Sequence, residues 1–227
     1  MSALAALALA SVAFVGTHFM MSHPLRAPMV SALGERGFSL TYVVVSFATL
    51  YLMTRFYGPA FAQSPAVLWE SNLVTWTVAT LLMWFGSILF VGSLRRNPAF
   101  PTGGKPVTHI GEARGVFAIT RHPMMWGFAT WALVHVIANP TPASLIVSTA
   151  IAILALGGAH GQDVKKVKLI GEPWRDWENR TSFLPFGRGL ASPGSFAIVG
   201  GTLLWLAATW AHGALGYRPA GIWALVA

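Results

Sequence analysis

Six stretches of the chain are apolar enough and long enough to cross a membrane as helices. They lie at roughly 3–22, 38–56, 72–94, 123–139, 142–161 and 195–213. A transmembrane helix needs about 20 mainly apolar residues, because each residue advances about 1.5 Å across about 30 Å of hydrocarbon. Helices are expected because backbone polar groups in lipid must be paired within the segment. The pattern predicts an all-α, polytopic membrane helical bundle with about six transmembrane helices, forming a single domain over residues 1–227.

Short polar segments separate these stretches. Asn139-Pro140-Thr141-Pro142 divides a long apolar run, and because proline interrupts a helix, the run predicts a helical hairpin. Residues 172–180 carry two tryptophans among charged residues, which predicts an amphipathic helix with its indoles in the headgroup region. The N-terminal stretch has no basic segment before it, which predicts a retained first helix and not a cleaved signal peptide.

Composition and charge add an orientation. Hydrophobic residues make up 55% of the chain and charged residues 10%, against about a quarter charged in globular proteins. Thirteen of the fifteen lysines and arginines fall in 22–37, 95–122 and 162–194. These loops alternate with loops that are poor in basic residues, so the positive-inside rule places both termini on the non-cytoplasmic side. The net charge of +8 is thus an orientation signal, and membrane lipid, not nucleic acid, is the expected partner.

The chain contains no cysteine, which excludes disulfides, thiolate metal sites and cysteine nucleophiles. Histidines inside the spans are the candidates for chemistry, because ionisable groups in hydrocarbon usually face a cavity or ligand. His18 and His135 are the two that lie well within apolar surroundings. Each could satisfy a buried hydrogen bond or bind a metal. With no carboxylate in any predicted span, imidazoles alone favour a metal that brings its own ligands, such as haem iron.

A second candidate site lies at the cytoplasmic ends of the helices. Arg121 and His122 directly precede Pro123, and proline is favoured at the first position of a helix. A helix N-terminus beside an arginine would attract an anion or a carboxylate. The alternative is simple positive-inside anchoring together with a loop network that includes Glu112 and Glu178.

Several motifs in order resemble those of the NnrU family of bacterial membrane proteins and, through it, plastid zeta-carotene isomerase. The resemblance is best over 10–56 and 105–190. The motifs are His18 with Leu25-Arg26 and Gly34-Glu35-Arg36, then Ile119-Thr120-Arg121-His122-Pro123, Trp131 to His135, and Arg180 to Phe186.

The resemblance implies a haem b held by His18 and His135 in a multi-pass protein of the bacterial inner membrane. It also implies a role in denitrification and nitric oxide metabolism, or in redox-dependent isomerisation of a hydrophobic small molecule, with a redox partner. The isomerase's cysteine has no equivalent at 132–134. The predicted helix ends put the two histidines about 13 Å apart in depth, so His122 or His160 stays open as the partner of His18.

A second resemblance is to membrane methyltransferases that use S-adenosylmethionine. It rests on the Arg121-His122-Pro123 helix start and on Gly171-Glu172 followed by two tryptophans. In that case Arg121 and His122 would seat the carboxylate of S-adenosylmethionine. The usual glutamate pair is replaced by Gln162-Asp163. A non-enzymatic membrane assembly factor is the third hypothesis, so enzymatic activity itself is left open.

Overall fold

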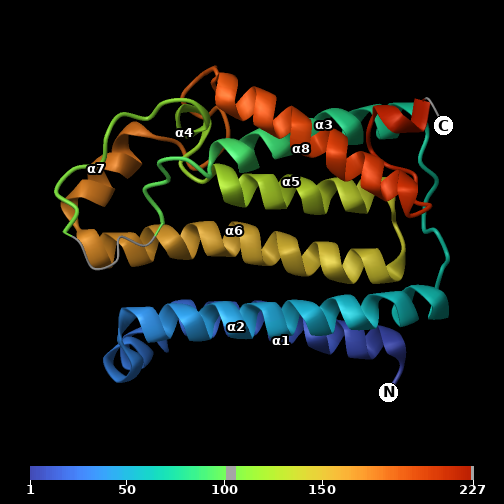
Figure 1. Cartoon of the computed structure of the whole chain (residues 1–227), viewed down its shortest axis with the longest axis horizontal. Coiled ribbons are helices and arrows are strands. Elements are labelled where there is room, and N and C mark those ends of the chain that lie inside the picture. Colours follow the sequence, from blue (N-terminus) through green and yellow to red (C-terminus); the bar gives the residue numbers. More distant parts are fainter. Residues whose placement is uncertain (101–105, 226–227) are drawn as a thin grey trace.

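The computed structural model describes residues 1–100 and 106–225, and the regular elements in them are all helical (Figure 1). The elements are α1 (Ala3–Ser22), α2 (Arg26–Gln63), α3 (Leu73–Gly92), α4 (Val116–Ile119), α5 (Pro123–Ala138), α6 (Pro142–Ile170), α7 (Glu172–Arg180), α8 (Ser195–Ala214) and the 3-10 helix η1 (Ile222–Leu225). The predicted all-α class is confirmed.

All six predicted spans are helices. Five of them, α1, α2, α3, α6 and α8, are long and apolar enough to cross a membrane, and α5 is a shorter apolar helix of 16 residues. The chain is therefore a multi-pass membrane protein. Figure 1 shows the start of α1 and the 3-10 helix η1 at the same end of the bundle, as an even number of crossings requires. The side of the membrane that they occupy stays a prediction.

Two helices are longer than the apolar pattern predicts. The predicted loop before residue 38 is helical from Arg26, with a break at Gly34, whose φ of 71° suits glycine. The 29 residues of α6 extend about 43 Å, beyond a hydrocarbon core of about 30 Å. Its charged last turns, from Asp163 onward, therefore continue the helix past the apolar span. Charge marks where a helix leaves the lipid, while Gly171, with φ 67°, marks where this helix ends.

The bundle has two halves joined by α6. The α1–α2 pair lies on one side of α6, and α5, with α3 and α8 beyond it, lies on the other (Figure 1). Small residues permit the close approach of helices within the second half. A Cβ on Gly127 would lie 3.0 Å from the carbonyl oxygen of Gly86, and a Cβ on Gly201 would lie 2.5 Å from the Cα of Ile88.

Substituting Gly201 with alanine is expected to destabilise the protein by about 1–3 kcal/mol, because the added methyl group meets backbone and forces α8 away from α3. Thermal unfolding of the purified protein in detergent measures the effect. Gly213→Ala on the same helix is the matched control, since nothing lies within 4 Å of its Cβ position. Equal melting temperatures for the two variants would contradict the packing argument.

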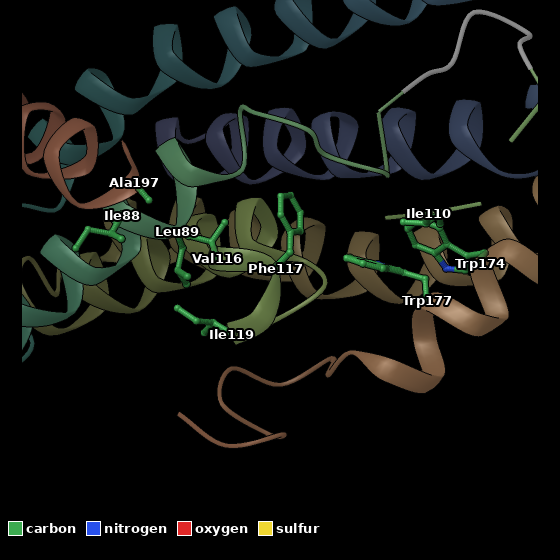
Figure 2. Packing of buried hydrophobic residues seen from close by; sticks show 9 residues of the cluster. All are labelled: Ile88, Leu89, Ile110, Val116, Phe117, Ile119, Trp174, Trp177 and Ala197. Carbon is green, nitrogen blue, oxygen red and sulfur yellow. The ribbon is translucent and has the colours of Figure 1, made fainter. Parts of the chain in front are cut away.

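The end of the bundle that carries α7 has its own hydrophobic core. We call it the cytoplasmic end, after the orientation that the positive-inside rule predicts, and the opposite end the non-cytoplasmic end. Helix α7 confirms the helix predicted at 172–180, but its indoles do not face the headgroups: Trp174 and Trp177 are 0% and 2% exposed. Figure 2 shows Trp174 beside Ile110, and Trp177 between this pair and Phe117. The headgroup assignment was wrong because Ile110 in the preceding loop and Phe117 on α4 pack with these rings, which sequence spacing along α7 does not reveal.

Candidate functional site

A buried charge cluster joins the start of α5 to α6. The chain just before α5 is held by hydrogen bonds from the backbone N–H of Arg121 to the Ser182 carbonyl (2.8 Å) and from the Thr120 hydroxyl to the Phe183 carbonyl (2.7 Å). The Arg121 guanidinium then reaches Asp163 on α6, with Nε at 2.9 Å and Nη2 at 2.8 Å from Oδ2. These bonds fix the N-terminus of α5 against the last turns of α6.

The other oxygen of Asp163 has partners of its own. His122 Nε2 lies 2.9 Å from Oδ1, and the indole of Trp174 donates to the same oxygen over 3.1 Å. The His122 side chain is fully buried and the Asp163 side chain is 8% exposed. The carboxylate that Arg121 and His122 were expected to attract is thus supplied by the chain itself, from a residue that the sequence pattern did not single out as a site.

The contacts of Asp163 with Arg121 and His122 bear on two hypotheses drawn from the sequence. The Arg121 and His122 groups that would seat the carboxylate of S-adenosylmethionine are already engaged with Asp163, so this cluster does not fit that role. In the predicted loop network, Glu112 pairs with Arg114 at 2.6 Å, away from Arg121. Glu178 lies beside the cluster, where burial and then the negative charge of Asp163 raise the pKa of its carboxyl.

His18 lies in the other half of the bundle, between α1 and α2. Its Nδ1 is 2.7 Å from the Phe14 carbonyl oxygen, and its ring centroid is 4.4 Å from that of Phe14 and 5.4 Å from that of Tyr42. The next residue, Phe19, contacts α6 at Gly157, where a Cβ would meet its ring at 2.9 Å. His18 is therefore near the level of Gly157 along α6.

His135 lies on the opposite side of α6. Its Nδ1 is 2.8 Å from the Trp131 carbonyl oxygen, and the Trp131 ring packs on the imidazole with centroids 3.8 Å apart. Its own carbonyl accepts a hydrogen bond from Ser144 on α6 over 3.5 Å. His135 is therefore near the level of Ser144, close to the non-cytoplasmic end of the bundle.

The two histidines predicted as haem ligands are not brought together. Ser144 and Gly157 are separated by about 20 Å along α6 at 1.5 Å per residue, and α6 stands between α1 and α5. Two axial nitrogens on one iron lie only about 4 Å apart. A haem between His18 and His135 does not fit this arrangement. The two other candidate partners are also elsewhere, since His122 contacts Asp163 and His160 lines a cytoplasmic pocket with Arg121. Haem binding itself stays a prediction.

His135 opens onto a pocket of about 500 Å³ between α2, α3, α5, α6 and α8. Its walls are mainly apolar, as expected of a small-molecule site. The side chains that line it include Met53, Tyr57, Met83, Trp131, Val134, His135, Asn139, Val147, Ser148, Trp205, Thr209, His212 and Arg218. Within residues 1–100 and 106–225, no group of three or more His, Asp or Glu side chains could hold a metal.

The segment after α8 covers one end of this pocket. Indole N–H groups of Trp76 and Trp205 donate to the carbonyls of Pro219 (2.9 Å) and Ala220 (3.2 Å), and Trp223 donates back to the Leu206 carbonyl over 2.8 Å. Tyr217, Arg218, Pro219 and Ala220 all line the pocket. Three indoles thus fasten a short tail over the non-cytoplasmic end of the pocket.

Sequence reasoning missed His212 as a site residue. It is an exposed residue near the end of α8, its ring centroid is 6.3 Å from that of His135, and both residues line the pocket. A usable signal was present: each histidine lies within the last turn of its helix, and both helices end on the same side of the bundle.

The sequence of this chain is similar to a known protein family and to two plant proteins. The family described as NnrU protein matches residues 6–219. The chloroplastic 15-cis-zeta-carotene isomerase of Zea mays is 27% identical over 184 residues, covering 78% of this chain and 48% of that protein. Its counterpart in Arabidopsis thaliana is 34% identical over 82 residues, covering 36% of this chain and 22% of that protein. The chain thus spans about half the length of the maize relative and a smaller part of the Arabidopsis thaliana relative. No solved structure matches.

Proposed function

Because this chain belongs to the NnrU family, we propose that it is a membrane-embedded, isomerase-like protein that acts on an elongated hydrophobic small molecule. The observation that carries the proposal is the apolar pocket of about 500 Å³ around His135. Two relatives named as isomerases of a carotene support a polyene as the substrate class. An isomerisation transfers no atoms between molecules, so the protein needs to bind the chain and lower the order of one double bond.

The pocket walls suit such a ligand. Apolar side chains from α2, α3 and α6, among them Met53, Met83 and Val147, would bury a hydrocarbon at about 25 cal/mol for each Å² removed from water. Methionine adapts its shape to irregular ligands. The polar groups gather at the non-cytoplasmic end, where the Asn139 amide donates to the Tyr57 hydroxyl over 3.3 Å. The imidazole of His135 would lie beside the bound hydrocarbon.

Finer parts of the proposal rest on the family resemblance. A haem b, if bound, would supply one-electron chemistry, and the protein's part would be to hold it, exclude water and align the polyene. We also propose a bacterial inner-membrane location and a role in nitric oxide metabolism, although the two relatives are chloroplastic. A non-enzymatic assembly role is the alternative that the following experiment distinguishes.

Filling the pocket tests the proposed function. Ser148 is 1% exposed and lines the pocket from α6, so Ser148→Phe is expected to weaken binding of a 15-cis polyene at least tenfold by occupying its space. Quenching of tryptophan fluorescence by the polyene in detergent measures binding, and chromatography of the isomers measures turnover. Ser39→Phe on the exposed face of α2 is the matched control. Unaltered binding in Ser148→Phe, or no binding by the wild type, would refute a substrate pocket here.

A further inference from the structure

We propose that the seam between the α1–α2 turn and α6 binds the phosphate group of an anionic phospholipid, through Arg26 on α2 and Lys165 on α6. The seam is distinct from the pocket around His135, which lies at the other end of the bundle. It is also distinct from the Asp163 cluster, which faces α5. The inference does not depend on the proposed function.

The end of α1 lies directly against α6 at the cytoplasmic end of the bundle, where the α1–α2 turn and α7 are found (Figure 1). His23 caps α1, and its ring is so close to Gly161 on α6 that a Cβ there would overlap it. Side chains four residues apart lie on one face of a helix, so Lys165 is the next α6 side chain along this seam. Across from it stands Arg26, the first residue of α2, whose positive charge reaches Lys165. Two cations therefore face each other where the helices meet.

The positive charge of Lys165 is not neutralised within the protein. The residue is half-buried, and no carboxylate of the described residues forms an ion pair with it. Burial, and then the charge of Arg26, lower the pKa of its ammonium group. The next residue, Lys166, is 7% exposed and turns the other way, donating to the carbonyls of Pro98 (3.4 Å) and Phe100 (3.3 Å). Burial, then Lys165 and Arg26, lower the pKa of Lys166 to about 8. An anion at the seam would stabilise both positive charges.

Arg26 keeps hydrogen-bond donors for such an anion. Its side chain is 21% exposed, and its Nη2 lies 3.0 Å from both carboxylate oxygens of Glu35. A guanidinium has five N–H groups, so those on Nε and Nη1 remain for a ligand. Glu35 neutralises only one of the three cations Arg26, Lys165 and Lys166. Arginine suits phosphate in particular, because its planar group can donate two parallel hydrogen bonds to it.

The depth of the seam identifies a lipid as the source of the phosphate. Helix α6 leaves the apolar span at Asp163, and Lys165 lies about 3 Å further along the axis, at the level of the headgroups. Exposed apolar side chains follow toward the hydrocarbon on both helices, with Met20 on α1 49% exposed and Leu156 on α6 38% exposed. They provide a surface for acyl chains. Basic sites between helices on the cytoplasmic side are typical binding sites for anionic headgroups.

Lipid titration of the purified full chain in a non-ionic detergent, measured by native mass spectrometry, tests the inference. Phosphatidylglycerol is expected to bind the wild type more tightly than phosphatidylcholine, whose headgroup has no net charge. Lys165→Gln should weaken phosphatidylglycerol binding by about fivefold, and Lys165→Arg should retain it. Lys168→Gln, at an exposed position on the next turn of α6, is the matched control. It removes the same charge outside the seam and should weaken binding by less than about twofold.

Thermal unfolding separates lipid binding from a purely structural role of Lys165. Without lipid, Lys165→Gln should melt no lower than the wild type, because it removes a like charge beside Arg26. Added phosphatidylglycerol should raise the melting temperature of the wild type and of Lys168→Gln, since a ligand stabilises the folded state that binds it. The rise should be clearly smaller in Lys165→Gln. A lower melting temperature of Lys165→Gln in lipid-free detergent, with an undiminished rise on adding lipid, would contradict the proposed role.

Three results of the titration overturn the inference. The first is equal affinity of Lys165→Gln and Lys168→Gln for phosphatidylglycerol, which would leave only a general attraction between charges. The second is equal affinity of the wild type for phosphatidylglycerol and phosphatidylcholine. The third is inorganic phosphate that binds as tightly as the lipid and displaces it, which would make the seam a site for a soluble anion.

Discussion

Asp163→Ala is expected to lower the free energy of unfolding by about 3–5 kcal/mol, because it leaves the Arg121 guanidinium buried without its carboxylate. The Arg121 side chain is 14% exposed and the Asp163 side chain 8%, so little water can solvate the guanidinium in place of the lost carboxylate. Chemical denaturation in detergent, followed by circular dichroism, measures the loss. His122 and Trp174 also lose a neighbour at Oδ1, which adds to the effect.

Two further variants make the Asp163 result interpretable. Asp176→Ala removes an exposed carboxylate that pairs with Arg180 at 2.7 Å, and surface pairs contribute only about 0–1 kcal/mol. The double variant Arg121→Met, Asp163→Leu should recover much of the stability, since it removes both charges. A loss in Asp163→Ala no larger than in Asp176→Ala would show that the cluster does not join α5 to α6 as described.

Trp174→Ala is expected to cost about 3–5 kcal/mol, because truncating a buried aromatic side chain leaves a cavity. The Trp174 side chain is fully buried in the cytoplasmic core with Ile110 and Trp177. Trp174→Phe separates the two contributions, since it retains most of the packing but loses the 3.1 Å bond to Asp163. The same unfolding experiment in detergent measures both variants.

The control for Trp174 is a tryptophan on the outer surface. Trp210 on α8 is 61% exposed and its position faces away from the protein core, so Trp210→Ala should change stability by less than about 1 kcal/mol. If Trp174→Ala behaves like Trp210→Ala, α7 does not contribute a core to the cytoplasmic end, and its predicted interfacial role would return.

The positions of the helices were predictable because every segment that crosses lipid must be apolar over about 20 residues and must pair its backbone polar groups internally. Apolar length alone located all six, and Pro123 and Pro142 correctly marked two starts. Helix ends were less accurate: α2 and α6 continue through charged residues such as Arg26 and Lys166, because a helix can leave the membrane without ending. Hydropathy indicates whether a residue lies in lipid or in water. The position at which a helix ends depends on its capping residues instead.

The candidate site was harder to predict because it depends on which helices are neighbours. Sequence reasoning selected His135, which lines the pocket, but paired it with His18, which lies across α6 from the pocket. Their separation depends on α6 standing between α1 and α5, a fact of packing order that no single segment encodes. Asp163 was missed for the same reason, since its partners come from α5 and α7.

The indole-fastened tail over the pocket also has a consequence for how a ligand arrives. Its backbone carbonyls are tied to Trp76 and Trp205 at the aqueous end, while the pocket draws its walls from α2 and α8, whose main packing partners are different helices. A hydrophobic ligand would then reach His135 by lateral entry from the bilayer. Its occupancy would follow the mole fraction in lipid and not the dissolved amount, so assays should be titrated per detergent micelle or per lipid.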